Sequence, residues 1–159
     1  MWPQYNRRIR ELVAGMTDEQ LAILPAPDLL PLWATVSHTA AMRVYWLCAV
    51  VGEPGIESTP FWNGSEAIDW ADDLDHPRSG WEVAAAMDST FALIDRCLDA
   101  WTFDMLTDEI ERHYGGTVQV HTRSSIVQRL FTHEAWHWGE LSQTLGIRGL
   151  PQPDLWRAD

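Results

Sequence analysis

Apolar residues recur at helical spacing in four stretches of the chain, and these stretches predict four helices. The first stretch covers residues 5–16 and is stopped by Gly15 and Thr17. The second runs to about Val51 from Asp28, a suitable N-cap residue. It is apolar nearly all round, which is typical of a helix in the middle of a bundle or of one that gives a second face to a partner subunit.

The third and fourth stretches have the clearest apolar stripes. The third helix is predicted to start after Ser79, with a stripe at alternating spacings of three and four residues, as in a packed bundle. This stripe consists of Ala84, Met87, Phe91, Ile94, Leu98 and Trp101. The fourth helix is predicted from its N-cap Thr122 to Gly146, with the stripe Ile126, Leu130, His133, His137 and Leu141.

Several tryptophans are expected to fill the core, namely Trp33, Trp46, Trp81 and Trp101.

Two segments between these helices lack helical periodicity. Residues 53–78 are rich in proline, glycine and acidic residues and predict a solvated acidic loop, with a lid or a subunit contact as the alternative. Residues 111–121 predict a small β-hairpin, an addition to the helices, with Gly115 and Gly116 supplying positive φ angles at the turn. The predicted fold is therefore all-α, an antiparallel four-helix bundle with a hairpin before the last helix, as a single domain over residues 1–159.

Composition and charge narrow the classes of function. The chain is 46% hydrophobic and 21% charged, as in globular proteins. Its formal net charge is -12, and its 11 basic residues are scattered arginines, so we expect no nucleic-acid partner. No signal segment opens the chain, and Arg43 interrupts the longest apolar stretch, so no membrane association is expected. Two cysteines, Cys48 and Cys97, are too few for a disulfide scaffold, which favours a cytoplasmic location.

The candidate chemistry lies in the histidines. His133 and His137 are four residues apart, so both imidazoles project from one side of a helix and can reach one metal ion. His38 is a candidate third ligand, because alanines beside it on its helix leave room, although a hydrogen-bonded core histidine is the alternative for this residue alone. Three neutral imidazoles leave a position for a thiolate or for a water whose pKa zinc lowers to about 7. The other histidines are expected to be exposed, namely His76, His113 and His121.

The segment from His133 to His137 also matches the zinc-peptidase pattern H-E-x-x-H, in which Glu134 would be the general base. A peptidase of this kind needs a third ligand, usually downstream, and a cleft for an extended chain. Only 22 residues follow His137, so this is the weaker interpretation. The neighbouring Trp136 and Trp138 are expected to wall the site.

Four motifs, in this order, resemble the DinB-like (YfiT-like) superfamily, and together they cover nearly the whole chain. They are MTDEQL at 16–21, PAP at 25–27, WATVSH at 33–38 and THEAWHWGELSQTLG at 132–146. The resemblance implies a four-helix bundle, often dimeric, with a three-histidine site for a divalent metal. The ligands that it implies are His38, His133 and His137, the same three residues that the helical spacing selects. Characterised members include thiol-dependent S-transferases and isomerases that use mycothiol or bacillithiol.

The resemblance predicts a metal-dependent enzyme that acts on a small molecule by thiol transfer or hydrolysis. Zinc is the favoured metal, and nickel, iron or manganese also suit imidazole ligands. The expected partners are a small-molecule substrate, a low-molecular-weight thiol and a second copy of the chain. A non-catalytic metal-binding bundle is the alternative.

The chain departs from the family pattern directly after the histidine pair. Members commonly continue as H-x-x-x-H-R-G-Q, whereas here Trp138 and Glu140 replace the Arg and the Gln. Glu140 lies seven residues after His133, nearly on the ligand face, where it could orient a ligand, act as an acid or base, or fill the open position. A surface glutamate paired with an arginine is an equal alternative.

Overall fold

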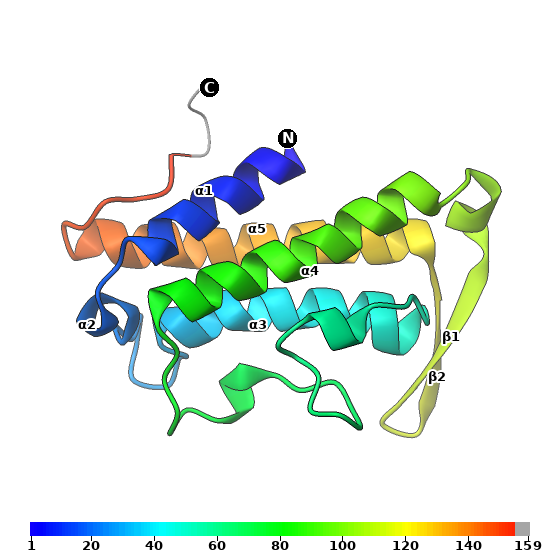
Figure 1. Ribbon diagram of the computed structural model, residues 1–159, viewed down its shortest axis with the longest axis horizontal. Coiled ribbons are helices and arrows are strands. Elements are labelled where there is room, and N and C mark those ends of the chain that lie inside the picture. The colour runs from blue at the N-terminus through cyan, green and yellow to red at the C-terminus, as the bar shows by residue number, and fades with distance from the viewer. Residues whose placement is uncertain (155–159) are drawn as a thin grey trace.

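The computed structural model describes residues 1–154, and it is mainly helical with one two-stranded hairpin (Figure 1). In this part of the chain the long helices are α1 (Trp2–Ala14), α3 (Leu32–Val44), α4 (Gly80–Ala100) and α5 (Arg123–Ile147). The short helical elements are α2 (Asp18–Leu21), the π-helix η1 (Tyr45–Val50) and the 3₁₀-helices η2 (Ile56–Ser58), η3 (Trp70–Asp72) and η4 (Asp104–Thr107). The antiparallel strands are β1 (Glu109–Tyr114) and β2 (Thr117–Thr122). The predicted helical fold with a hairpin before the last helix is confirmed.

Helix α3 packs against both α4 and α5, and α4 also packs against α1, so that α4 lies between α1 and α3 (Figure 1). Eleven of the 13 residues of α3 are buried, so its apolar surface is used within the chain. The predicted start at Asp28 is wrong, because Pro31 has an extended backbone and the helix begins after it. From Tyr45 the helix continues as the π-helix η1, which ends near Gly52, a glycine with φ of 86°.

The first helix begins at Trp2, earlier than the predicted stretch, and the predicted starts of the last two long helices agree with the structure. At α4 the Ser79 hydroxyl accepts the Glu82 N–H at 3.4 Å, and the Glu82 carboxylate accepts the Ser79 N–H at 2.9 Å. Thr122 and Ser125 cap α5 in the same reciprocal way. The glycine after Ser79 lets the start of α4 approach the end of α1, because a Cβ there would collide with the carbonyl oxygen of Val13.

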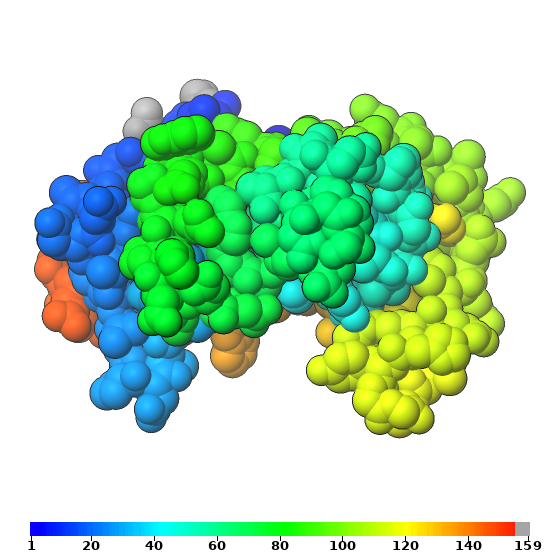
Figure 2. All heavy atoms as spheres, turned by 60° about the horizontal axis from the view of Figure 1, so that its bottom comes forward, coloured from blue at the N-terminus to red at the C-terminus, as the bar shows by residue number. Residues whose placement is uncertain are grey.

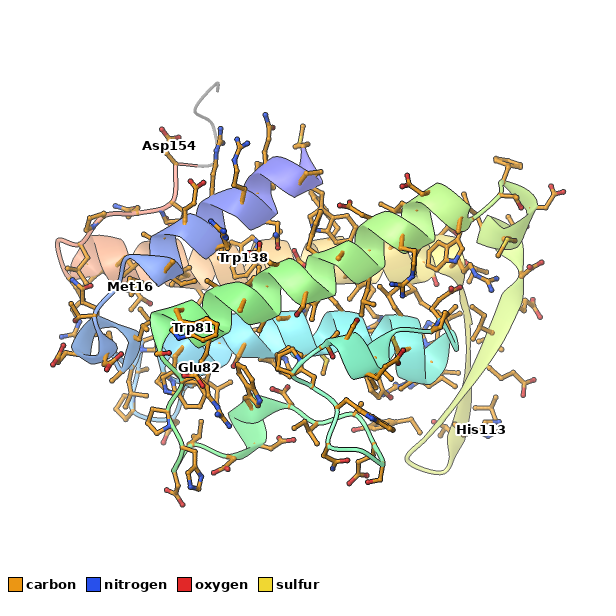
Figure 3. The ribbon with its side chains drawn as sticks, in the orientation of Figure 1. Met16, Trp81, Glu82, His113, Trp138 and Asp154 are labelled. Carbon is orange, nitrogen blue, oxygen red and sulfur yellow. The ribbon has the colours of Figure 1, made fainter. Side chains whose placement is uncertain are left out.

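Two predictions of buried residues on α4 are wrong. Leu98 is 46% exposed, and Trp81 is 71% exposed at the start of the helix (Figure 3). Trp101, also expected in the stripe, comes just after α4, where its indole N–H donates to Glu53 at 2.7 Å. In the last turn of α4 the buried residue is Cys97, which is 2% exposed, and its neighbour Leu98 faces away from the core.

One buried ion pair connects the four long helices of the described chain. Arg43 of α3 is fully buried, and its Nε and Nη2 donate to the two carboxylate oxygens of Glu134 on α5, at 2.7 and 3.0 Å. Its Nη1 donates to Asn6 Oδ1 of α1 at 2.8 Å and to the Met87 carbonyl oxygen of α4 at 3.1 Å. Glu134 also accepts the Trp2 indole N–H at 2.9 Å. Both charges are thus compensated inside the protein.

The segment after α5 turns back toward α1 (Figure 1). Its Gln152 forms a 3.0 Å hydrogen bond with Ser142 on α5. The prolines Pro151 and Pro153 in the sequence predict a surface strap over residues 147–159, and residues 155–159 of that prediction lie outside the described part of the chain. No helix within residues 1–154 combines the length and the apolar character needed to cross a bilayer.

We expect Arg43→Met to lower the free energy of unfolding by about 3–5 kcal/mol, because it leaves the Glu134 carboxylate buried without its guanidinium partner. Urea unfolding followed by circular dichroism measures this loss. Arg10→Met is the matched control, since Arg10 pairs with Asp88 at the surface at 3.0 Å and its removal should cost about 0–1 kcal/mol. Equal losses in the two variants would contradict a special role for the buried pair.

Candidate metal centre

Three histidines meet on one side of the interface between α3 and α5. His38 comes from α3, and His133 and His137 come from successive turns of α5. One nitrogen from each imidazole lies within 4.8 Å of the other two. The ring centroids are 4.6 Å apart for the α5 pair, and His38 lies 5.1 and 5.6 Å from them. The structure therefore brings together the three residues that the sequence predicts as ligands.

A carboxylate orients the imidazole of His38. The Nδ1 of this ring lies 2.6 Å from Oδ2 of Asp69, and the other oxygen of Asp69 accepts the backbone N–H of Ala71 at 2.9 Å. When Nδ1 carries the proton that is donated to Asp69, Nε2 is left with the free lone pair. The carboxylate is itself fixed by its turn, so it holds both the orientation and the tautomer of the ring.

Asp69 lies in the acidic segment 53–78, which is partly solvated as the sequence predicts and partly packed on the body of the protein. The Phe61 side chain is fully buried, and its ring packs on Trp70 at a centroid distance of 4.9 Å. The Ile68 N–H donates to the Phe61 carbonyl oxygen at 3.0 Å, which fixes the chain just before Asp69. Sequence reasoning missed this residue because nothing in an aperiodic acidic stretch shows which carboxylate faces α3.

A second carboxylate lies beside His137. Glu140, three residues later on α5, places Oε2 3.0 Å from the Nδ1 of His137. Of the roles that the sequence leaves open for Glu140, this contact supports the orientation of a ligand. Among the described residues no arginine pairs with Glu140, so the structure does not support the alternative of a surface ion pair.

The third imidazole, that of His133, has a buried Nδ1 without a hydrogen-bond partner. Burial, together with the nearby His137 and His38, lowers the pKa of His133 to about 4. This ring is therefore neutral at physiological pH, as a histidine must be to bind a metal ion.

The glutamate of the H-E-x-x-H match does not face the histidines. Glu134 is 2% exposed, and its carboxylate is occupied by Arg43 and Trp2 in the interior. Successive residues on a helix point about 100° apart, which places Glu134 away from the side of its neighbour His133. This geometry contradicts the peptidase interpretation, because a general base must reach the bound substrate.

Of the two tryptophans expected to wall the site, one does so. Trp136 lines a cavity together with His133 and His137. Trp138 instead lies against α1, where it is 2% exposed and lines a separate groove with Trp2 (Figure 3). The prediction for Trp138 is therefore wrong, because the residue after His137 on a helix turns toward the interior.

Two cavities adjoin the histidine cluster. One has a volume of about 650 Å³ and is lined by His133 and His137. The other has a volume of about 430 Å³ and is lined by His38 and Asp69. Tyr45, the first residue of the π-helix, lines both cavities, and so does Met42 of α3. Each volume suits a small molecule.

The hairpin forms one wall of the larger cavity. Arg112 and Tyr114 of β1 both line it, so the hairpin is not merely an addition to the helices. Figure 2 shows the turn of the hairpin projecting from the body of the molecule beside a hollow.

The remaining histidines lie outside the cluster. His76 and His113 are exposed, as predicted, the latter on the hairpin (Figure 3). His121 is half-buried, with its ring 5.0 Å from that of Trp46, so the prediction of exposure is wrong there.

A mainly helical fold with three converging histidines defines the class of this protein, and the comparison with known families agrees. The chain belongs to the DinB superfamily, whose family model matches residues 4–141. A DinB-like protein from Bacillus cereus ATCC 10987 has a similar structure, with a TM-score of 0.65 and 18% identity, covering 98% of this chain and 93% of that one. A conserved protein from Enterococcus faecalis is similar with a TM-score of 0.59, 18% identity and 89% coverage of each chain. At these identities the likeness concerns the fold. No curated protein matches.

If His38 binds a metal ion, Asp69→Asn should weaken the binding of added Zn²⁺ about 10- to 100-fold, because an amide cannot compensate the positive charge on the His38 ring as a carboxylate does. Competition with a chromophoric chelator measures the affinity. Asp75→Asn is the control, since it makes the same change at an exposed position of the same segment and should leave the affinity unchanged. An equal loss in both variants would assign the effect to overall charge.

Proposed function

We propose that this protein is a metal-dependent enzyme that acts on a small molecule, with His38, His133 and His137 as the metal ligands. The observation that carries the proposal is the meeting of three imidazoles where two cavities adjoin. Carboxylates beside two of the rings add support, because metal-binding histidines almost always donate their second ring N–H to a carboxylate, a backbone carbonyl oxygen or water.

The donor set fits a divalent metal ion. The orphaned Nδ1 of His133 argues against a self-contained hydrogen-bonded cluster, in which a buried polar atom would have a partner. Three neutral imidazoles suit zinc best, and nickel, iron or manganese are also compatible. Such an ion supplies Lewis-acid chemistry when it is bound. Asp69 and Glu140 would then hold two of the rings in the tautomer that binds it.

The nucleophile of the reaction comes from outside the chain in this proposal. Neither Cys48 nor Cys97 lines the two cavities beside the histidines. Burial raises the pKa of both thiols to about 11, which leaves little reactive thiolate at neutral pH. The candidate nucleophiles are therefore water, for hydrolysis, and a low-molecular-weight thiol of the mycothiol or bacillithiol type, for S-transfer.

A non-catalytic metal-binding bundle is the competing function, and it requires the cluster to be closed off. Glu140 is hydrogen-bonded to Nδ1 of His137, and Trp138 packs against α1. Neither side chain lines the larger cavity, so neither closes it. The accessible space beside the imidazoles favours an enzyme.

We also propose three properties from the family resemblance: an antiparallel four-helix bundle, a homodimer and a cytoplasmic location. The packing of α1, α3, α4 and α5 supports the first. The net charge of -12 is also unfavourable for binding nucleic acid, which agrees with a small-molecule substrate.

Elemental analysis of the purified protein tests the metal site. We expect about one divalent metal ion per chain, and loss of most of it in His38→Ala, because two imidazoles from one helix bind far more weakly than three. His76→Ala, which removes an exposed histidine, is the control and should keep full occupancy. Full occupancy in His38→Ala would contradict the site.

Activity is tested with electrophilic and ester substrates, each assayed with and without a low-molecular-weight thiol. Turnover that requires the thiol assigns S-transfer, and turnover without it assigns hydrolysis. Metal-loaded protein that turns over neither panel would favour the non-catalytic bundle.

A further inference from the structure

Two arginines beside the histidine cluster lack acidic partners in a chain with a large excess of acidic residues. The chain has 23 acidic and 11 basic residues, and several arginines form ion pairs with carboxylates, namely Arg10, Arg43, Arg78 and Arg123. Within residues 1–154, no carboxylate pairs with Arg112 or Arg129. Both of them line the cavity of about 650 Å³ that also contains His133 and His137.

Both guanidinium groups are held by aromatic rings. The central carbon of Arg112 lies 4.1 Å from the ring centroid of Tyr114 and 5.0 Å from that of Trp46. The corresponding carbon of Arg129 lies 4.8 Å from the same Trp46 ring. Two positive charges are thus placed against one indole, and their mutual repulsion would be relieved by an anion in the cavity.

Arg112 is preorganised for this role, and its hydrogen-bonding capacity is not exhausted. Its Nε donates to the Tyr45 hydroxyl at 2.8 Å, and its Nη1 donates to Gln119 on β2 at 2.8 Å. The Nη2 group has no partner among the described residues, which leaves its N–H donors for a ligand. The guanidinium of Arg129 makes no hydrogen bond in the same part of the chain. A planar guanidinium with free N–H groups suits the two oxygens of a carboxylate or phosphate.

The rest of the cavity fits an apolar group attached to the anion. Aromatic side chains line it, among them Tyr45, Trp46, Tyr114 and Trp136. Trp136 is 76% exposed, which is costly for so large an apolar side chain unless a ligand covers it.

The neighbouring cavity has the opposite charge. Asp69 and Asp72 line it on the far side of the histidine cluster, so an anionic group would be repelled there. The arginines therefore set the direction of a bound molecule, with its anionic end toward the hairpin and the remainder extending toward the imidazoles.

We propose that Arg112 and Arg129 form an anion-binding subsite, and that the substrate is a small molecule with an anionic group attached to an aromatic or apolar body. The inference rests on the proposed function, which supplies the reaction at the histidines. Two arginines in a chain of net charge -12 suit a single anionic group and not a polyanion.

Binding of three probe compounds tests the subsite without turnover. The probes are phenylacetate, phenyl phosphate and the neutral phenylacetamide, and quenching of tryptophan fluorescence reports their binding beside Trp46 and Trp136. We expect at least one of the two anions to bind on the order of tenfold more tightly than the amide. The tighter anion identifies the group that the site prefers. Equal binding of all three would overturn the proposal.

Arg129→Met should reduce the preference for the anion several-fold, since it removes one of the two charges. Arg129 is the residue to substitute, because it is exposed and its loss disturbs no hydrogen bond. Arg148→Met is the matched control, with the same loss of charge at an exposed position beyond the end of α5. An unchanged preference in Arg129→Met, or an equal loss in Arg148→Met, would overturn the proposal.

The same titrations on His38→Ala and on protein treated with a chelator separate this inference from the proposed function. A preference for the anion that persists in both supports a subsite built by the arginines. If the preference for the anion disappears in both samples, the anion is bound by a metal ion and the proposed subsite is overturned. Failure of the metal site alone is detected separately, by elemental analysis.

Discussion

The guanidinium of Arg43 is buried among groups from four helices, and its charge is compensated only while those helices keep their positions. Glu134 neutralises it from α5, and oxygen acceptors on α1 and α4 take its remaining hydrogen bonds. Arg43 is five residues from His38 on α3, and Glu134 is adjacent to His133 on α5. The pair therefore fixes the register of α3 against α5, and that register places the histidines opposite one another. A register shift would leave two charges buried without partners, at a cost of several kcal/mol.

The segment from His133 to His137 shows how one helical turn serves two purposes. Its histidines face the cavities, and Glu134 between them faces the interior and stabilises the fold. The match to a zinc-peptidase pattern is correct as a string of letters, but the helix directs the glutamate away from the site. The chemistry of a motif depends on which groups the fold leaves accessible.

Charge is distributed unevenly around the histidine cluster despite the acidic character of the chain. Asp69 and Glu140 contact two of the imidazoles, and their negative charges would partly balance a divalent ion. Beyond the cluster, one cavity contains arginines and the other contains aspartates. The hairpin, which contributes few core residues, supplies Arg112 to the basic side. Tyr45, the first residue of the π-helix, lines both cavities, and such irregular turns are frequent at functional sites.

The sequence by itself determined the long helices, the caps at Ser79 and Thr122 and the glycine turn of the hairpin. It also determined that His133 and His137 lie on the same side of one helix. Each of these depends on residues a few positions apart, where helical spacing or turn geometry dictates the outcome. The position of Asp69 beside His38, which is 31 residues away, depends on contacts between distant segments. The cavity formed by β1 with α5, and the exposure of Trp81 and Leu98, were likewise decided only by the tertiary structure. Periodicity reports which face of a helix is apolar, but the neighbours that cover that face come from elsewhere in the chain.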